Sequence, residues 1–166
     1  MQTDPSKVIV RDLRPGDAGW LIQRHAELYA ESDGFDSCFE TFVANIMSDF
    51  IQNHDPEMER FWITEVEGRR VGCICCAKSE EPDIAKLRLF LVEPEARGLG
   101  IGHLLLNLCL KHASNVGFRK MRLWTFASLE AATALYRKHG FVCVLSNETD
   151  LFGAKRIEQV WERPLD

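Results

Sequence analysis

Apolar residues recur along the chain with two periods, and each period predicts a type of element. Val8–Leu13 reads as a first strand that ends at a Pro-Gly turn. After Asp17, which we expect to cap the next helix, apolar side chains recur every three or four residues as far as Leu28. A second helix with a period near 3.6 covers Phe39–Phe50. The first third of the chain is therefore predicted to be one strand followed by two helices.

The remainder of the chain alternates strands with helices. Strands are predicted over Phe61–Val66, Val71–Ala77, Ala85–Val92, Met121–Phe126, Phe141–Leu145 and Arg156–Trp161, and helices from about Leu104 to Gly117 and over Glu130–His139. Leu87, Leu89 and Leu91 are expected to share one face of their strand, and Gly117 is expected to end its helix at a position where glycine is favoured. The order β-α-α-β-β-β-α-β-α-β-β indicates an α/β fold with a mixed central sheet. No repeat, low-complexity tract or linker interrupts the pattern, so we expect a single domain over residues 1–166.

Composition narrows the class of protein. No apolar stretch is long enough to span a bilayer, and residues 1–7 lack the apolar core of a signal peptide, which predicts a cytoplasmic protein without a membrane partner. A net charge of −5 argues against a nucleic-acid partner and suits a cationic substrate. The six cysteines include C-I-C-C at 73–76 but no second ligand pair at zinc-finger spacing, so we interpret them as reduced structural thiols and expect no metal.

The stretch E-P-E-A-R-G-L-G-I-G-H-L-L-L at 93–106 places three glycines between a predicted strand and a predicted helix. Backbone N–H groups are free at the start of a helix, where the helix dipole is positive. Glycine lets such a backbone adopt positive φ and approach a bulky anion, and Arg97 adds a cation. The spacing is neither a dinucleotide fingerprint nor a Walker loop. A tight turn that needs glycine for steric reasons alone is the plainer alternative.

Three motifs in order resemble the GCN5-related N-acetyltransferase (GNAT) superfamily. R-G-L-G-I-G at 97–102 matches its pyrophosphate-binding loop, L-F-L-V-E-P at 89–94 looks like the strand before that loop, and A-x-x-L-Y-x-x-x-G-F at 132–141 looks like its C-terminal signature. The resemblance covers nearly the whole chain. It implies a GNAT-like, mainly antiparallel central sheet of six to seven strands flanked by about four helices. R-H-x-x-L-Y-A at 24–30 and the residues at 86–102 further resemble a bacterial branch that is often fused behind a MarR-type regulator.

The resemblance implies transfer of an acetyl group from acetyl-coenzyme A to an amine. It assigns cofactor binding to two stretches of backbone and the side chain of Arg97: Phe90, Leu91, Val92, Arg97, Gly98, Leu99, Gly100, Ile101, Gly102 and His103. Ser128 is expected to replace the asparagine with which many relatives contact the cofactor. A backbone N–H near Leu91 or Val92 is expected to stabilise the thioester oxyanion. Tyr136 aligns with the family's tyrosine and is the expected donor of a proton to the leaving thiolate, although such a residue can also simply pack.

The acceptor and the base remain open at this stage. Some relatives carry a glutamate base where this chain has Trp124, and many carry an asparagine where it has Leu129. Glu27, Glu31 and Asp33 are candidate bases, and each is also readily explained as a solvated carboxylate. His25 is better explained as a hydrogen-bonded core histidine.

Several aromatic residues lie in the two predicted N-terminal helices and the segment between them. We prefer core packing as their explanation and keep an acceptor pocket as the alternative: Trp20, Tyr29, Phe35, Phe39 and Phe42. The expected enzyme acetylates a primary amine of a small molecule, amino acid or peptide. A non-catalytic acyl-coenzyme A sensor is the alternative, and a toxin that acetylates aminoacyl-tRNA is a third reading that the acidic balance disfavours. Dimers are common in the superfamily, which makes a homodimer the favoured assembly.

Overall fold

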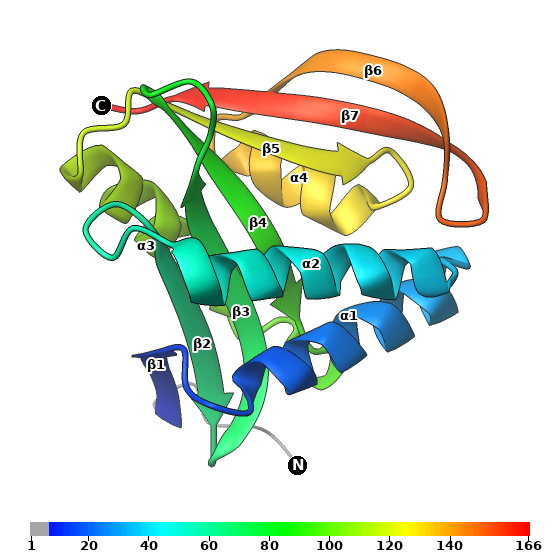
Figure 1. Cartoon of the computed structure of the whole chain (residues 1–166), viewed down its shortest axis with the longest axis horizontal. Helices are drawn as coiled ribbons and strands as arrows, with labels where there is room; N and C mark the ends of the chain where they lie inside the picture. Colours follow the sequence, from blue (N-terminus) through cyan, green and yellow to red (C-terminus); the bar gives the residue numbers. More distant parts are fainter. Residues whose placement is uncertain (1–6) are drawn as a thin grey trace. The chain divides into compact units, whose positions relative to one another are not determined.

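The computed structural model describes residues 7–166, and the elements follow the predicted order (Figure 1). Their bounds are β1 Val8–Asp12, α1 Asp17–Asp33, α2 Ser37–Asn53, β2 Arg60–Val66, β3 Arg69–Lys78, β4 Ile84–Val92, the 3₁₀ turn η2 Pro94–Ala96, α3 Ile101–Asn115, β5 Lys120–Phe126, α4 Glu130–Lys138, β6 Val142–Leu151 and β7 Ala154–Pro164. The strands form a seven-stranded, mainly antiparallel sheet in the order β1-β2-β3-β4-β5-β7-β6. The predicted mixed α/β fold is thus confirmed. The expectation about a signal peptide concerns residues that, except for Lys7, lie outside the described part.

Packing divides the described chain into two compact units. The first comprises residues 7–14, 56–121 and 164–166, and the second comprises residues 15–55 and 122–163. The single domain over residues 1–166 stays a prediction.

The first unit is built on β1, β2, β3 and β4, which pair antiparallel in sequence order. Glu67 and Gly68 both have positive φ, 51° and 76°, and connect β2 to β3 as the predicted hairpin turn. Helix α3 packs against β3 and β4. Its Leu105 and Cys109 are fully buried, as are Ile63 on β2 and Cys73 on β3. Burial of this apolar face is the main driving force for holding the helix at the end of β4.

Strand β4 departs from the predicted alternation. Leu87, Leu89 and Leu91 were expected on one face, but Leu87 lies opposite Cys76 and Leu91 opposite Cys73. These cysteines are three residues apart on β3, so Leu87 and Leu91 point to opposite faces of the sheet. The register of β4 against β3 shifts beside Leu89, whose φ of 50° lies in the left-handed region. One extra residue in β4 produces this bulge. The expectation of one shared leucine face was wrong because regular alternation assumes an uninterrupted ladder.

The second unit contains α1, α2, α4 and the hairpin of β6 and β7. Helices α1 and α2 pack against each other, and α4 places Tyr136 beside Trp161 of β7. Strand β6 is longer than predicted, because it continues past Leu145 to Leu151 through residues that are nearly all exposed. The hairpin closes where Leu151 pairs with Ala154, and Figure 1 shows it in orange and red. An exposed strand carries no apolar alternation that would reveal its end.

Two helix ends also test the sequence reasoning. The residue that caps α1 is Gly16, with φ of 95°, while Asp17 is the first helical residue and is fully buried. The expected Asp17 cap was therefore wrong. Gly117, with φ of 99°, follows Val116 at the end of α3, where a left-handed glycine was expected.

Candidate active site

The glycine-rich loop leads from β4 into the first turn of α3. Gly98 and Gly100 have φ of 82° and 78°, a conformation that side chains disfavour. Gly100 is the N-cap of α3 and provides no side-chain hydrogen bond to the helix. The N–H groups of the first turn have no partner within the helix, and they lie at the positive end of its dipole. This arrangement suits a phosphate or pyrophosphate group.

The glycines of the loop have two explanations, an anion-binding backbone and a turn too crowded for side chains. The space around the loop distinguishes them. A Cβ atom at Gly98 or Gly100 would meet no heavy atom within 4 Å. The glycines are therefore required by backbone conformation and not by close contact within the protein. Arg97 is exposed, and its Nε donates a long hydrogen bond of 3.4 Å to the carbonyl of Val92. A cation and an open loop thus lie together at the end of β4.

Gly72 of β3 lies against Ile101, the first residue of α3. The sequence analysis did not identify this glycine as important. A Cβ atom there would lie 2.7 Å from Thr64 Oγ1 and 3.1 Å from the carbonyl oxygen of Leu91. It would also lie 3.3 Å from Cγ2 of Ile101, the first residue of α3. Thr64 Oγ1 is buried with no hydrogen-bond partner among the described residues. Only a residue without a side chain lets β2, β3 and α3 approach this closely.

The β4 backbone, to which the resemblance assigns the pantetheine arm, contains the bulge at Leu89. The Cys73 thiol donates a hydrogen bond of 3.2 Å to the carbonyl oxygen of Leu89. Leu91 is buried, while Phe90 and Val92 are half-buried. A left-handed leucine in a strand is costly, by about 1–3 kcal/mol, and such strain is concentrated at functional sites.

Tyr136 and Ser128 belong to the second unit. Tyr136 is buried on α4, with its ring centroid 5.7 Å from that of Phe141 and 6.5 Å from that of Trp161. Ser128 is exposed in the loop before α4, and Leu129 is the helix N-cap without a side-chain hydrogen bond. Tyr136 is therefore held by packing against two aromatic rings.

The candidate bases on α1 differ in their surroundings. Glu27 is exposed and accepts hydrogen bonds from Gln23 at 2.8 Å and Arg24 at 2.5 Å. These bonds, from Gln23 first and then Arg24, lower the pKa of Glu27 and make it a weaker base. Glu31 is also exposed and Asp33 is half-buried. Trp124, at the position of the glutamate in some relatives, is 46% exposed.

His25 lies in the core of the second unit. Its Nδ1 is 2.9 Å from the carbonyl oxygen of Leu21, and its Nε2 has no partner among residues 7–166. Burial lowers the pKa of His25 from 6.5 to about 4. The histidine is neutral near pH 7, in agreement with the interpretation of a hydrogen-bonded core residue.

The early aromatic residues pack with the turn of the β6–β7 hairpin. Phe35 and Phe39 are buried, and both contact the ring of Phe152, at centroid distances of 5.3 Å and 5.1 Å. Phe42 is 44% exposed at the margin of the cluster. Core packing, the preferred explanation, accounts for Phe35 and Phe39.

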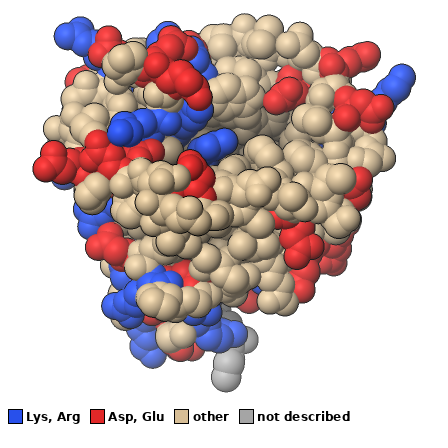
Figure 2. Space-filling model, in the orientation of Figure 1, with Lys and Arg blue, Asp and Glu red and all other residues tan. Residues whose placement is uncertain are grey.

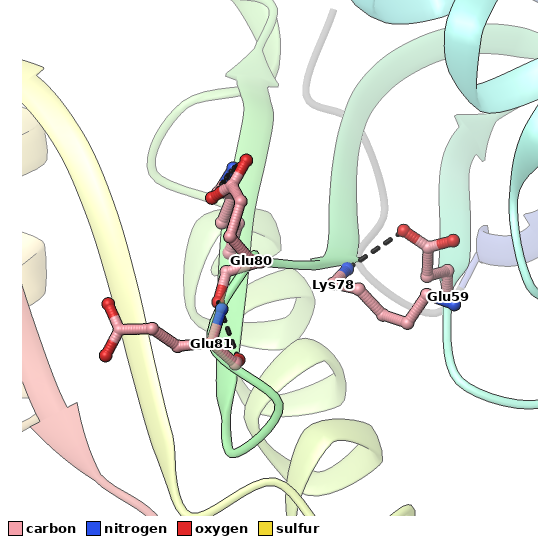
Figure 3. Close-up of polar contacts among 6 residues, drawn as sticks. Glu59, Lys78, Glu80 and Glu81 are labelled. Carbon is pink, nitrogen blue, oxygen red and sulfur yellow. Dashed lines mark hydrogen bonds and ion pairs between the residues drawn. The ribbon is translucent and has the colours of Figure 1, made fainter.

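A second group of carboxylates surrounds the turn between β3 and β4 (Figure 3). Glu59 Oε1 accepts a hydrogen bond of 2.9 Å from the backbone N–H of Lys78, and Glu80 forms an ion pair of 3.3 Å with Lys86. This turn lies at the opposite end of β4 from the glycine loop. These carboxylates therefore stabilise the turn and are not placed to act at the loop.

The described residues contain neither a membrane-spanning helix nor a metal-binding cluster. None of the helices within residues 7–166 is both long and apolar enough to cross a membrane. The same residues contain no group of three or more His, Cys, Asp or Glu side chains placed to hold a metal ion. The six cysteines, all within the described residues, form no disulfide, and Cys73, Cys75, Cys76 and Cys109 are buried.

Comparison with known proteins identifies the family. The sequence pattern of the acetyltransferase (GNAT) family matches residues 22–141. An uncharacterized N-acetyltransferase of Methanocaldococcus jannaschii is 31% identical over 86 residues, which are 49% of this chain and 38% of that protein. The chain thus spans well under two thirds of the length of that relative. Together with the loop and the order of elements, the family match is decisive: the chain belongs to the acetyltransferase (GNAT) family.

Solved structures confirm the fold. The ribosomal-protein-alanine N-acetyltransferase of Brucella melitensis superposes with a TM-score of 0.77 at 20% identity, covering 95% of this chain and 99% of that one. The protein yncA of Salmonella typhimurium, solved with its cofactor acetyl-CoA, gives a TM-score of 0.73 at 15% identity, covering 96% of this chain and 94% of that one. At these identities the likeness concerns the fold alone.

Proposed function

We propose that the protein transfers the acetyl group of acetyl-coenzyme A to a primary amine of a small molecule, amino acid or peptide. The observation that carries this proposal is the loop that opens α3, where Gly98 and Gly100 are left-handed and leave the first-turn N–H groups without side-chain caps. These donors suit the pyrophosphate of the coenzyme. Arg97 adds a cation, and the proposed set extends over Gly98–His103.

The remaining roles follow the order of the reaction. The pantetheine arm pairs with the backbone of Phe90, Leu91 and Val92, as an added strand would. The amine nitrogen attacks the thioester carbon, and a backbone N–H near Leu91 stabilises the oxyanion. When the tetrahedral intermediate collapses, the C–S bond breaks and Tyr136 gives its proton to the coenzyme A thiolate. The attacking nitrogen loses its extra proton as it becomes the amide, and a proton returns to the tyrosinate through solvent, so that the phenol is restored. A phenol is suited to this step because its pKa of about 10 is close to that of a thiol, about 8.5.

The amine must lose a proton before it attacks. For a lysine-like amine with a pKa of about 10.4, deprotonation at pH 7 costs about 4.6 kcal/mol. The lowered pKa of Glu27 and the burial of His25 make both poor acceptors for this proton. We therefore assign no side chain as the general base and route the proton to solvent.

A second function remains a candidate because of one residue. Trp124 occupies the position at which some relatives carry a glutamate base, and an indole cannot accept a proton. This observation favours a domain that binds acyl-coenzyme A as a sensor without turnover. The resemblance to the branch that is often fused to MarR-type regulators also favours a sensor. Membership of that branch stays a prediction, and so does the homodimer.

Two measurements on the same protein test the proposal. Calorimetry with acetyl-coenzyme A is expected to give saturable binding, and the absence of binding at millimolar cofactor would contradict the account. Release of free thiol is then followed across a panel of amines. Turnover of at least one amine supports the enzyme, whereas cofactor binding without turnover of any amine favours the sensor.

A further inference from the structure

Strand β6 forms an edge of the sheet. It stands last in the strand order, and among the described strands it pairs with β7 alone. Figure 1 shows it in orange beside β7. Of its ten residues only Thr149 is half-buried, and the others are exposed. Backbone N–H and C=O groups along such an edge are available to pair with a strand of another chain.

The first half of β6 is apolar although it is exposed. Val142, Val144 and Leu145 are each half or more exposed, and Cys143 between them is exposed as well. Lysine and proline commonly protect an edge strand from unwanted pairing, and β6 contains neither. At the other edge of the sheet, β1 has five residues and includes Arg11. An open edge combined with exposed apolar side chains is typical of an interaction surface.

The register of the hairpin shows that β6 is complementary to itself. Val142 lies opposite Glu162 of β7, and Leu145 lies opposite Val160. Glu162 and Val160 are two residues apart, so Val142 and Leu145 point to the same face, with Val144 as the extra residue of a bulge. A second β6 running antiparallel would place its Leu145 opposite Val142 and its Val142 opposite Leu145.

Charged groups at the two ends of this surface are complementary as well. Arg137 of α4 lies near the beginning of β6, because its guanidinium carbon is 5.1 Å from the ring centroid of Trp161, which is opposite Cys143. Glu148 lies further along β6, exposed and opposite Ile157. Trp161 and Ile157 are four residues apart on β7, so Arg137 and Glu148 lie on the same face. Antiparallel pairing therefore brings Glu148 of each copy toward Arg137 of the other.

We propose that β6 pairs antiparallel with β6 of a second copy of this chain, about a two-fold axis close to Val144. Each contact across a two-fold axis occurs twice, so both the apolar and the charged pairs are doubled. Acidic and basic side chains lie beside each other over the face drawn in Figure 2, so the net charge of −5 forms no uniform repelling surface there. The resemblance favours a homodimer without naming its surface, and this inference names the surface independently of acetyl transfer.

Sedimentation of the whole protein over a range of concentrations tests the surface. We expect a monomer–dimer equilibrium for the wild type. Leu145→Lys is expected to weaken the dimer at least about tenfold, because it places an unpaired ammonium group at both apolar contacts. Ile9→Lys is the control, since Ile9 is similarly exposed but lies on the opposite edge strand. A wild type that stays monomeric up to millimolar concentration, or equal weakening by the two variants, would overturn the proposal.

Charge reversal distinguishes a second copy from an unrelated partner strand. Arg137→Glu and Glu148→Arg are each expected to weaken the dimer several-fold, because each change brings like charges together. The double variant restores unlike pairs and is expected to recover the wild-type equilibrium. Circular dichroism establishes that each variant is folded. A double variant no better than the single ones would contradict the two-fold arrangement, because an unrelated partner would not change its charges in step.

Discussion

The Sγ atom of Cys73 lies 3.2 Å from the carbonyl oxygen of Leu89, and the thiol donates a hydrogen bond to it. Leu89 is the left-handed residue of the β4 bulge, and Cys73 is fully buried on the neighbouring strand. The bond therefore holds a strained peptide in place. The backbone that follows Leu89 is the segment to which we assign the thioester.

This relationship predicts a catalytic effect of a buried thiol. Cys73→Val removes the donor at similar size and is expected to reduce kcat about tenfold, because small displacements of a reacting group slow the reaction steeply. Cys73→Ser keeps a donor and is expected to recover most of the loss. Steady-state kinetics at saturating acetyl-coenzyme A measure both effects.

Cys76→Val is the matched control for this comparison. Cys76 is also buried on β3, but its thiol is hydrogen-bonded to Cys109 instead of β4. Its replacement is expected to change stability without changing kcat. Equal kcat values for the Cys73 and Cys76 variants would show that the bond to Leu89 has no part in positioning.

Gly72→Ala tests the support beneath α3. The new methyl group would lie 2.7 Å from Thr64 Oγ1, so β3 and the start of α3 must move apart. We expect a loss of about 1–3 kcal/mol in the free energy of unfolding, measured by urea denaturation. Coenzyme A binding is expected to weaken as well, because the first turn of α3 carries the proposed pyrophosphate donors. Gly19→Ala, in open space within α1, is the control and is expected to be neutral or stabilising. Equal stability of the two variants would mean that the crowding at Gly72 is relieved without cost.

Tyr136→Phe separates proton donation from packing. The phenylalanine ring retains the contacts with Phe141 and Trp161. Acetyl-coenzyme A affinity is expected to stay within about twofold of wild type while kcat falls about a hundredfold, the usual size of a general-acid effect. Calorimetry and thiol release provide the two values. Undiminished turnover would leave Tyr136 as a packing residue.

His25 predicts the acid sensitivity of the fold. Its pKa is about 4 in the folded protein, against 6.5 without burial. Below pH 6.5 the unfolded chain therefore binds a proton that the folded chain does not, and stability falls between pH 6.5 and 4 by about 3 kcal/mol. His25→Leu is expected to flatten this part of the pH profile in urea denaturation, while His54→Gln retains it. A His25→Leu profile parallel to that of wild type would contradict the assignment.

Local pattern predicted much of the fold. The helical period identified α1 and α2, and the Glu67-Gly68 pair identified the β2–β3 turn. The glycine loop was found because left-handed glycines before a helix leave a direct signal in the sequence.

Features that depend on contacts between distant residues were not predictable in this way. The bulge at Leu89 depends on the pairing of β4 with β3, and the need for glycine at position 72 depends on Thr64 and Ile101. Arg156 reaches a carbonyl 123 positions away in the sequence. No spacing within a single element reports such contacts.

Coenzyme A binding by Gly100→Glu, measured by calorimetry, tests the central claim most directly. The substitution places a carboxylate where backbone amides are proposed to hold a pyrophosphate, at a residue whose φ of 78° disfavours any side chain. Gly19→Glu adds the same charge in open space on α1 and serves as the control. The account predicts that Gly100→Glu loses coenzyme A affinity at least about a hundredfold while Gly19→Glu binds like wild type. Unchanged affinity in a folded Gly100→Glu protein would contradict it.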